Sequence, residues 1–250
     1  MKHDWIQAEW PAPANVRTIC TTRSGGVSKG PWSSFNLGPR CGDDAFLVEQ
    51  NRAILNKVLP SPAQWLHQVH GNVVVRHSGR STREIKGDAL VAFGKGEVCA
   101  VMTADCLPVF FCNRAGARVG VAHAGWRGLA NGILQATVQA LDEVPTNLLA
   151  WMGPAIGPAV YEVGSDVAEA FPGEFPAGFT CHNERFLLDI YSLAKLKLAE
   201  AGVHSVSGGE YCTLSDHERF FSYRRDGVTG RMASLVWFEG RDKGPENQRE

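Results

Sequence analysis

Three residues whose side chains commonly bind transition metals lie in the middle of the chain: His70, Cys106 and His123. A structural zinc site usually closes its tetrahedron with four Cys or His ligands. A catalytic site keeps three protein ligands and leaves the fourth position to water or substrate. The sequence contains no C-x-x-C pair. If the fold brings the three residues together, they could therefore form a catalytic zinc site, although their spacing alone is not specific for one.

Each of these residues also has a structural explanation. A free Cys is commonly buried, and a buried His is usually a hydrogen-bonded polar group. The separations in sequence are 36 and 17 residues, so the fold must bring the three together. One thiolate and two imidazoles suit zinc, and copper is the alternative metal because blue-copper centres also use two His and one Cys.

Oxidation of phenols at several coppers would need many more histidines. No two of the other histidines form an H-x-H pair. These six are scattered along the chain, at positions 3, 67, 77, 182, 204 and 217. The supply of ligands therefore argues against a multicopper site.

Two charged residues next to the metal ligands are candidate catalytic residues. Asp105 precedes Cys106, and a carboxylate beside a metal-bound water can move its proton. Arg127 follows His123 by four positions at the predicted start of a helix, where a guanidinium and backbone amides can hold phosphate. The alternatives are a turn residue for Asp105 and a surface ion pair for Arg127.

Three further polar residues are candidates for substrate binding: Arg23, Asn36 and Gln68. Their side chains offer one cation and neutral donors and acceptors for a sugar or a purine. Structural alternatives stay open for all three. Asn36 could fix a turn, Arg23 could pair with Asp43 or Asp44, and Gln68 could satisfy backbone groups.

Several long motifs occur in an order that identifies a family. They are the segments around the three metal candidates together with Thr22–Val27, Phe35–Gly38, Gly153–Pro158, Phe221–Asp226 and Gly230–Ser234. With these motifs the chain resembles the bacterial YfiH-like proteins, also described as laccase-domain proteins, polyphenol oxidases or multifunctional purine nucleoside phosphorylases. The resemblance covers nearly the whole chain.

The resemblance implies that His70, Cys106 and His123 bind zinc. It also implies phosphorolysis of adenosine, inosine and methylthioadenosine, together with deamination of adenosine. Purine nucleosides and phosphate would then be the partners. Three other functions stay open: a copper-dependent polyphenol oxidase, a metal-free hydrolase with Cys106 as nucleophile and His123 as base, and a factor that edits peptidoglycan precursors.

The elements that must position these residues follow from apolar periodicity. Strands are expected at 16–21, 73–75, 89–93, 98–102, 109–112, 118–122, 148–152, 220–223 and 232–238. Helices are expected after Asp43 or Asp44, over 129–141, from Ser165 to Phe171, and from Asp189 to near Gly202. The first of these helices would carry Phe46, Leu47, Ile54, Leu55 and Val58. His123 would then lie where a strand ends and a helix begins.

This pattern predicts an α+β fold with mixed β-sheets flanked by helices, and the resemblance suggests α/β/β/α layers. We expect one catalytic domain over residues 1–240 and a polar tail over 241–250. The 25 basic and 26 acidic residues nearly cancel, which predicts neither nucleic acid nor membrane as a partner. Seven dispersed cysteines and the lack of an apolar leader predict a cytoplasmic protein. The oligomeric state does not follow from the sequence.

Overall fold

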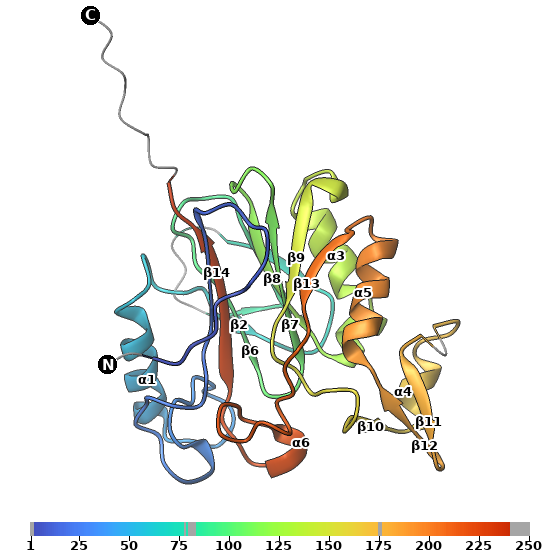
Figure 1. Cartoon of the computed structure of the whole chain (residues 1–250). Coiled ribbons are helices and arrows are strands. Elements are labelled where there is room, and N and C mark those ends of the chain that lie inside the picture. Colours follow the sequence, from blue (N-terminus) through green and yellow to red (C-terminus); the bar gives the residue numbers. More distant parts are fainter. Residues whose placement is uncertain (1–2, 78, 80–83, 175–176, 241–250) are drawn as a thin grey trace, which may run out of the picture.

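The computed structural model describes residues 3–77, 79, 84–174 and 177–240 and has four layers (Figure 1). Helix α1 (Ala45–Asn56) covers a three-stranded antiparallel sheet of order β1-β14-β6. A six-stranded mixed sheet of order β13-β9-β7-β8-β5-β3 packs against the other face of the three-stranded sheet. Helices α3 (Ile133–Ala140) and α5 (Ile190–Glu200) cover the far face of the six-stranded sheet. The predicted single-domain α+β fold with α/β/β/α layers is confirmed.

The strands of the two large sheets have the following bounds. The three-stranded sheet contains β1 (Val16–Cys20), β14 (Met232–Phe238) and β6 (Cys99–Thr103). The six-stranded sheet contains β13 (Ser205–Gly208), β9 (Leu148–Met152), β7 (Leu107–Asn113), β8 (Val119–Ala124), β5 (Ala89–Ala92) and β3 (Val74–Arg76). Its outer pairs β13–β9 and β3–β5 are parallel, and its inner pairs are antiparallel.

The remaining elements are short. A small sheet is formed by β10 (Glu162–Val163), β12 (Arg185–Leu188) and β11 (Phe179–His182), and β2 (Leu66–His67) pairs with β4 (Ile85–Lys86). The other helices are α2 (Trp126–Ala130), α4 (Ser165–Glu169) and α6 (Tyr223–Asp226), with 3-10 turns at Gly30–Trp32 and Pro145–Asn147.

The layers are held together by alternation along the central strands. In β7, Phe110 packs into the cluster shared with Val101 and Val236 of the smaller sheet. Its neighbour Phe111 packs into the cluster that contains Ile133 of α3. Successive residues of a strand point to opposite faces, so β7 is buried on both sides. This explains its continuous apolar sequence.

The structure corrects three of the element predictions. The helix expected over 129–141 is broken at Gly132, which has a φ of 80°, and becomes α2 and α3. Residues 220–223 do not form a strand, because helix α6 begins at Tyr223. Helix α1 ends at Asn56, so Val58 lies outside it, and Phe46 and Val58 are 67% and 49% exposed.

Two further expectations concern the ends of the chain and the membrane. No helix in the described part of the chain is long and apolar enough to cross a bilayer. The polar tail expected over residues 241–250 lies outside the described residues.

Candidate functional site

The register of the six-stranded sheet places two of the predicted metal ligands at the same end of its central strands. His123 in β8 lies opposite Pro108 in β7, and Cys106 directly precedes β7. On the other side of β8, Ala89 of β5 pairs with Ala122. This pairing places Asp88 beside His123, whose backbone N–H donates to the Asp88 carbonyl over 2.7 Å.

Asp88 also fixes the loop that carries His70. Its fully buried carboxylate accepts hydrogen bonds from the backbone N–H groups of Val69, His70 and Gly71, with distances of 2.8 to 3.2 Å. The same carboxylate lies 2.9 Å from Nδ1 of His123. One buried acid therefore sets the position of both histidines.

His70, Cys106 and His123 form a compact cluster. One ligand atom from each lies within 4.8 Å of the others, and the Cys106 Sγ lies 3.8 Å from Nε2 of His70. His123 is buried, Cys106 is partly buried and His70 is exposed. The cluster therefore has one side in the protein and one side open to a ligand.

The backbone around the cluster adopts conformations that side chains other than Gly rarely take. His70 and Asp105 have φ values of 60° and 94°, in the left-handed region where non-Gly residues are uncommon. Gly125 leaves room for the thiol, because a Cβ at this position would come within 2.8 Å of the Cys106 Sγ. Backbone strain of this kind is concentrated at functional sites.

The electrostatics of the cluster favour a thiolate. Burial raises the pKa of Cys106, but the positive charge of His123 and hydrogen bonds from both histidines bring it below its usual value. Burial lowers the pKa of His123, and the charge of Cys106 and the hydrogen bond with Asp88 raise it above its usual value. Because Nδ1 of His123 faces the Asp88 carboxylate and donates to it, Nε2 is the His123 atom that is free to bind a metal.

The donor set and its geometry fit zinc. A thiolate and an imidazole bound to the same tetrahedral zinc are roughly 3.5 Å apart, close to the observed 3.8 Å between Cys106 and His70. A His ligand that passes its second N–H to a carboxylate is the usual arrangement at protein metal sites. Three donors, rather than four, leave one coordination position for a ligand.

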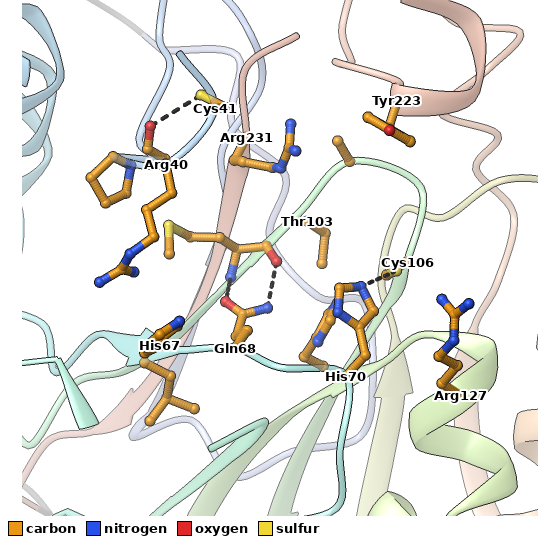
Figure 2. A pocket seen from close by; sticks show the side chains of 16 residues that line it. Arg40, Cys41, His67, Gln68, His70, Thr103, Cys106, Arg127, Tyr223 and Arg231 are labelled. Carbon is orange, nitrogen blue, oxygen red and sulfur yellow. Dashed lines mark hydrogen bonds between the residues drawn. The ribbon is translucent and has the colours of Figure 1, made fainter. Parts of the chain in front are cut away.

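A pocket of about 540 Å³ opens over the cluster (Figure 2). This is the size of a small-molecule site. Arg40, Arg127 and Arg231 line it, as do His67 and the three predicted metal ligands, and none of the described lining residues is Asp or Glu. In Figure 2, Arg40 and Arg127 lie on opposite sides of the pocket, with His70 and Cys106 nearer to Arg127. Arg40 is paired with Glu84, whereas no ion pair with a described carboxylate holds Arg127 or Arg231. The positive charge of these two side chains favours an anionic ligand.

The structure places Asp105 next to the cluster but turns its carboxylate toward the protein. One oxygen accepts from the Thr213 hydroxyl over 2.6 Å, and the other accepts from the backbone N–H of Arg224 over 2.7 Å. The loop before Cys106 is thereby tied to the C-terminal part of the chain. Asp105 does not line the pocket, and its part in proton transfer stays a prediction.

Arg127 lies where the sequence suggested, at the start of α2 and in the pocket. Its guanidinium stacks on the ring of Trp126 at 4.4 Å, and no ion pair with a described carboxylate holds it. Helix α2 has only five residues. The side chain, rather than a helix N-terminus, is therefore the feature that can bind an anion here.

The three predicted substrate-binding residues have structural contacts. Arg23 donates to the carbonyls of Ser33 and His217, and it does not line the pocket. Asn36 is fully buried, and its side chain bonds Gly38, Cys41, Asp43 and the N–H of Arg231. Gln68 lines the pocket, but its amide pairs with both backbone groups of Met102. Substrate contacts by these residues stay a prediction.

Sequence reasoning missed several residues that shape the site. Asp88 gave a usable signal: metal-bound histidines are generally oriented by a carboxylate, and this Asp precedes a buried strand. Arg40, Tyr223 and Arg231 also line the pocket. The last two belong to motifs that carried the family resemblance, but spacing alone could not direct them to the metal cluster.

Comparison with known proteins gives consistent matches over most of the chain. A family model described as multi-copper polyphenol oxidoreductase laccase matches residues 17–239. The purine nucleoside phosphorylase YfiH of Escherichia coli (strain K12) is 50% identical over 237 residues, which cover 93% of this chain and 98% of the relative. A purine nucleoside phosphorylase of Pseudomonas aeruginosa is 49% identical and covers 94% of this chain and 98% of its own length.

The solved structures agree with this result. The crystal structure of Neisseria meningitidis protein NMB0706 superposes with a TM-score of 0.91 at 48% sequence identity. The match covers 95% of this chain and all of the Neisseria chain.

Proposed function

The chain belongs to the multi-copper polyphenol oxidoreductase laccase family, and from this membership we propose that it is a zinc-dependent purine nucleoside phosphorylase. Relatives about half identical to it carry the name purine nucleoside phosphorylase. The proposed substrates are adenosine, inosine and methylthioadenosine, each with inorganic phosphate. Deamination of adenosine in the same pocket is part of the proposal.

The observation that carries the proposal is the charge of the pocket beside the metal-ligand cluster. Three arginines and no described carboxylate line a cavity of about 540 Å³. Arg40 is paired with Glu84 outside this lining, and Arg127 and Arg231 have no ion pair with a described carboxylate. Phosphorolysis needs an anion and a neutral nucleoside in the same cavity. A lining of this charge favours the anion, and the volume lies within the usual range for small-molecule sites.

In this proposal His70, Cys106 and His123 hold the zinc ion, and Asp88 keeps both imidazoles in position. A bound zinc ion supplies positive charge that polarises a substrate oxygen or a water molecule. Arg127 holds phosphate through paired hydrogen bonds from its planar guanidinium. Its place on the rigid ring of Trp126 limits its motion.

The proposed reaction exchanges one bond to the ribose for another. A phosphate oxygen forms a bond to C1′ of the ribose, while the bond between C1′ and the purine nitrogen breaks. The bonding electron pair leaves with the purine, which takes up a proton. The products are free base and ribose 1-phosphate, or 5-methylthioribose 1-phosphate when methylthioadenosine is the substrate. The task of the chain is to hold the two substrates in line and to keep phosphate close to C1′.

Chromatography of the products tests the proposal. The zinc-loaded protein is incubated with adenosine in the presence and in the absence of phosphate. Adenine that forms only with phosphate is the expected result, and inosine formed alongside it supports the deaminase activity. Absence of free base in both samples would refute the phosphorylase.

The description of the family favours a second function, oxidation of polyphenols. A multicopper oxidase binds several coppers, whereas one group of three potential ligands comes together within the described residues. Oxygen consumption by copper-loaded protein with a diphenol measures this activity directly. The phosphorylase proposal predicts that consumption stays at the level of free copper.

A further inference from the structure

Tyr223 is an exposed aromatic side chain at the pocket, and no other Phe, Tyr or Trp is present among the described lining residues. Its side chain is 61% exposed. We propose that the purine ring of the substrate stacks on Tyr223 and that this contact selects for a purine-sized base. This inference rests on the proposed function, because it assumes that a purine nucleoside enters the pocket.

The backbone that carries Tyr223 is fixed on both sides. The Ser222 side chain caps α6 by accepting from the N–H of Arg225 over 3.2 Å. The N–H of Arg224 donates to Asp105 over 2.7 Å. The Arg225 guanidinium also donates to the carbonyls of Thr213, Leu214 and Phe220. The residues around Tyr223 therefore hold its Cα rigidly in place.

The Tyr223 side chain does not take part in these contacts. Its hydroxyl has no hydrogen-bond partner among the described residues, and its ring contact is with the Arg231 guanidinium at 5.9 Å. Arg231 is in turn held by the carbonyls of Thr229 and Gly230, each 2.9 Å from its Nη1. A Tyr side chain has only two torsion angles, and the backbone that carries Tyr223 is fixed, so little conformational entropy is lost when a planar ligand contacts the exposed ring.

The chain also links this ring to the metal cluster. Arg224, the residue after Tyr223, bonds to Asp105, and Asp105 is followed by Cys106. In Figure 2, Tyr223 and Cys106 lie on the same side of the pocket. A base stacked on Tyr223 would therefore place its sugar toward the cluster and toward Arg127.

The strength of a stacking contact depends on the area of the ring and much less on its exocyclic groups. The contact should therefore contribute equally to adenosine and inosine, which share the purine ring system. It should contribute less to a pyrimidine nucleoside, whose ring is smaller. In nucleic-acid complexes, replacing a stacking aromatic residue by Ala weakens binding by roughly 5- to 150-fold.

The test compares Tyr223→Ala, Tyr223→Phe and a matched control, Phe46→Ala. Phe46 is an aromatic residue on α1 that is 67% exposed and does not line the pocket. KM is measured for adenosine and inosine at saturating phosphate, and for phosphate at saturating nucleoside. Tyr223→Ala should raise both nucleoside KM values by roughly 5- to 150-fold, with unchanged phosphate KM and zinc content. Tyr223→Phe and Phe46→Ala should behave as the parent.

Three results would overturn the stacking contact: unchanged nucleoside KM in Tyr223→Ala, an equal loss in Tyr223→Phe, or a loss confined to one of the two purines. The parent protein tests the proposed function separately, through phosphate-dependent release of base. If the parent releases no base, equilibrium dialysis of labelled adenosine against the zinc-loaded parent and Tyr223→Ala decides the question. Weaker binding by the variant alone supports stacking, and equal binding or no binding refutes it.

Discussion

A cysteine lies at each end of strand β7, and the pKa values of the two thiols are shifted in opposite directions. Cys106 stands just before the strand, and Cys112 lies near its other end, roughly 20 Å away at the usual rise of a strand. Burial raises the pKa of Cys112 to about 12 and outweighs the charge of Arg114, which acts in the opposite direction. At Cys106 burial acts in the same direction, but the histidines outweigh it and lower the pKa.

Cys20 shows the same effect of burial on the thiol pKa as Cys112. It is buried between the two sheets, and burial raises its pKa to about 12 despite a hydrogen bond with Ser234. An isolated thiol in apolar surroundings stays protonated and acts as a small hydrophobic group. The lesson is that burial alone does not activate a cysteine. The charge and the hydrogen bonds of its neighbours decide its role.

The largest effect is expected from replacing the cysteine at each end of β7. Cys106→Ala should lose the bound zinc and roughly a thousandfold or more in phosphorolysis, because a ligand is removed from a site that supplies several kcal/mol. Cys112→Ala is the matched control and should cost only about 1 kcal/mol of stability. Zinc per chain, measured on folded protein, checks both. Full zinc in Cys106→Ala would remove this residue from the ligands.

The second prediction concerns the acid that connects the two sides of the cluster. Asp88→Asn keeps the size of the side chain but replaces one carboxylate oxygen by a donor. It weakens the contacts to the His70 loop and to Nδ1 of His123. Loss of such an outer partner typically costs 10- to 100-fold in metal affinity. Competition with a zinc chelator measures this affinity, and a parental value would show that the ligands orient themselves without Asp88.

The third prediction separates anion binding from metal binding. Arg127→Ala should raise the KM for phosphate by roughly 10- to 150-fold or more, because each hydrogen bond to a charged group contributes about 1.5 to 3 kcal/mol. Zinc content should not change, since no hydrogen bond or ion pair between described residues joins Arg127 to the proposed ligands. Arg127→Lys keeps the charge but loses the paired hydrogen-bond geometry, so its KM for phosphate should lie between those of the parent and Arg127→Ala. Identical phosphate saturation in Arg127→Ala and the parent would assign phosphate to another residue of the pocket.

The sequence predicted most strands and helices well because they depend on apolar periodicity, whereas the α/β/β/α layers were expected from the family resemblance. The central strands and the Asp44 and Asp189 caps were found where expected, and both Asp side chains accept backbone N–H groups in the structure. The break at Gly132 was missed, because the apolar spacing runs on through this turn from α2 to α3. Residues 220–223 are apolar enough for a strand, but Ser222 caps a helix there instead.

The site was predictable only in part. The three ligand candidates were found from residue type and family resemblance, and the structure brings them together. Asn36 and Gln68 illustrate the limit: a polar side chain in a motif can bind a substrate or satisfy the backbone. Only the contacts in the structure show that both now bond to protein groups. Asp88 was missed because its role depends on the pairing of β5 with β8, which is a property of the tertiary structure.

The smallest effect is expected in the pH dependence of alkylation, which tests the comparison without a mutation. After zinc is removed with a chelator, the Cys106 thiolate should persist below the pH at which free cysteine, with a pKa near 8.5, loses its charge. Its reaction with iodoacetamide should therefore reach a plateau at lower pH than free cysteine. Cys20 and Cys112 should stay unreactive in the folded protein, because their pKa values near 12 keep them protonated. Mass spectrometry of the peptides gives each rate, and reloading zinc should protect Cys106. A profile for Cys106 that matches free cysteine would mean that the two histidines do not set its charge, and the contrast between the ends of β7 would then reduce to a difference in solvent access.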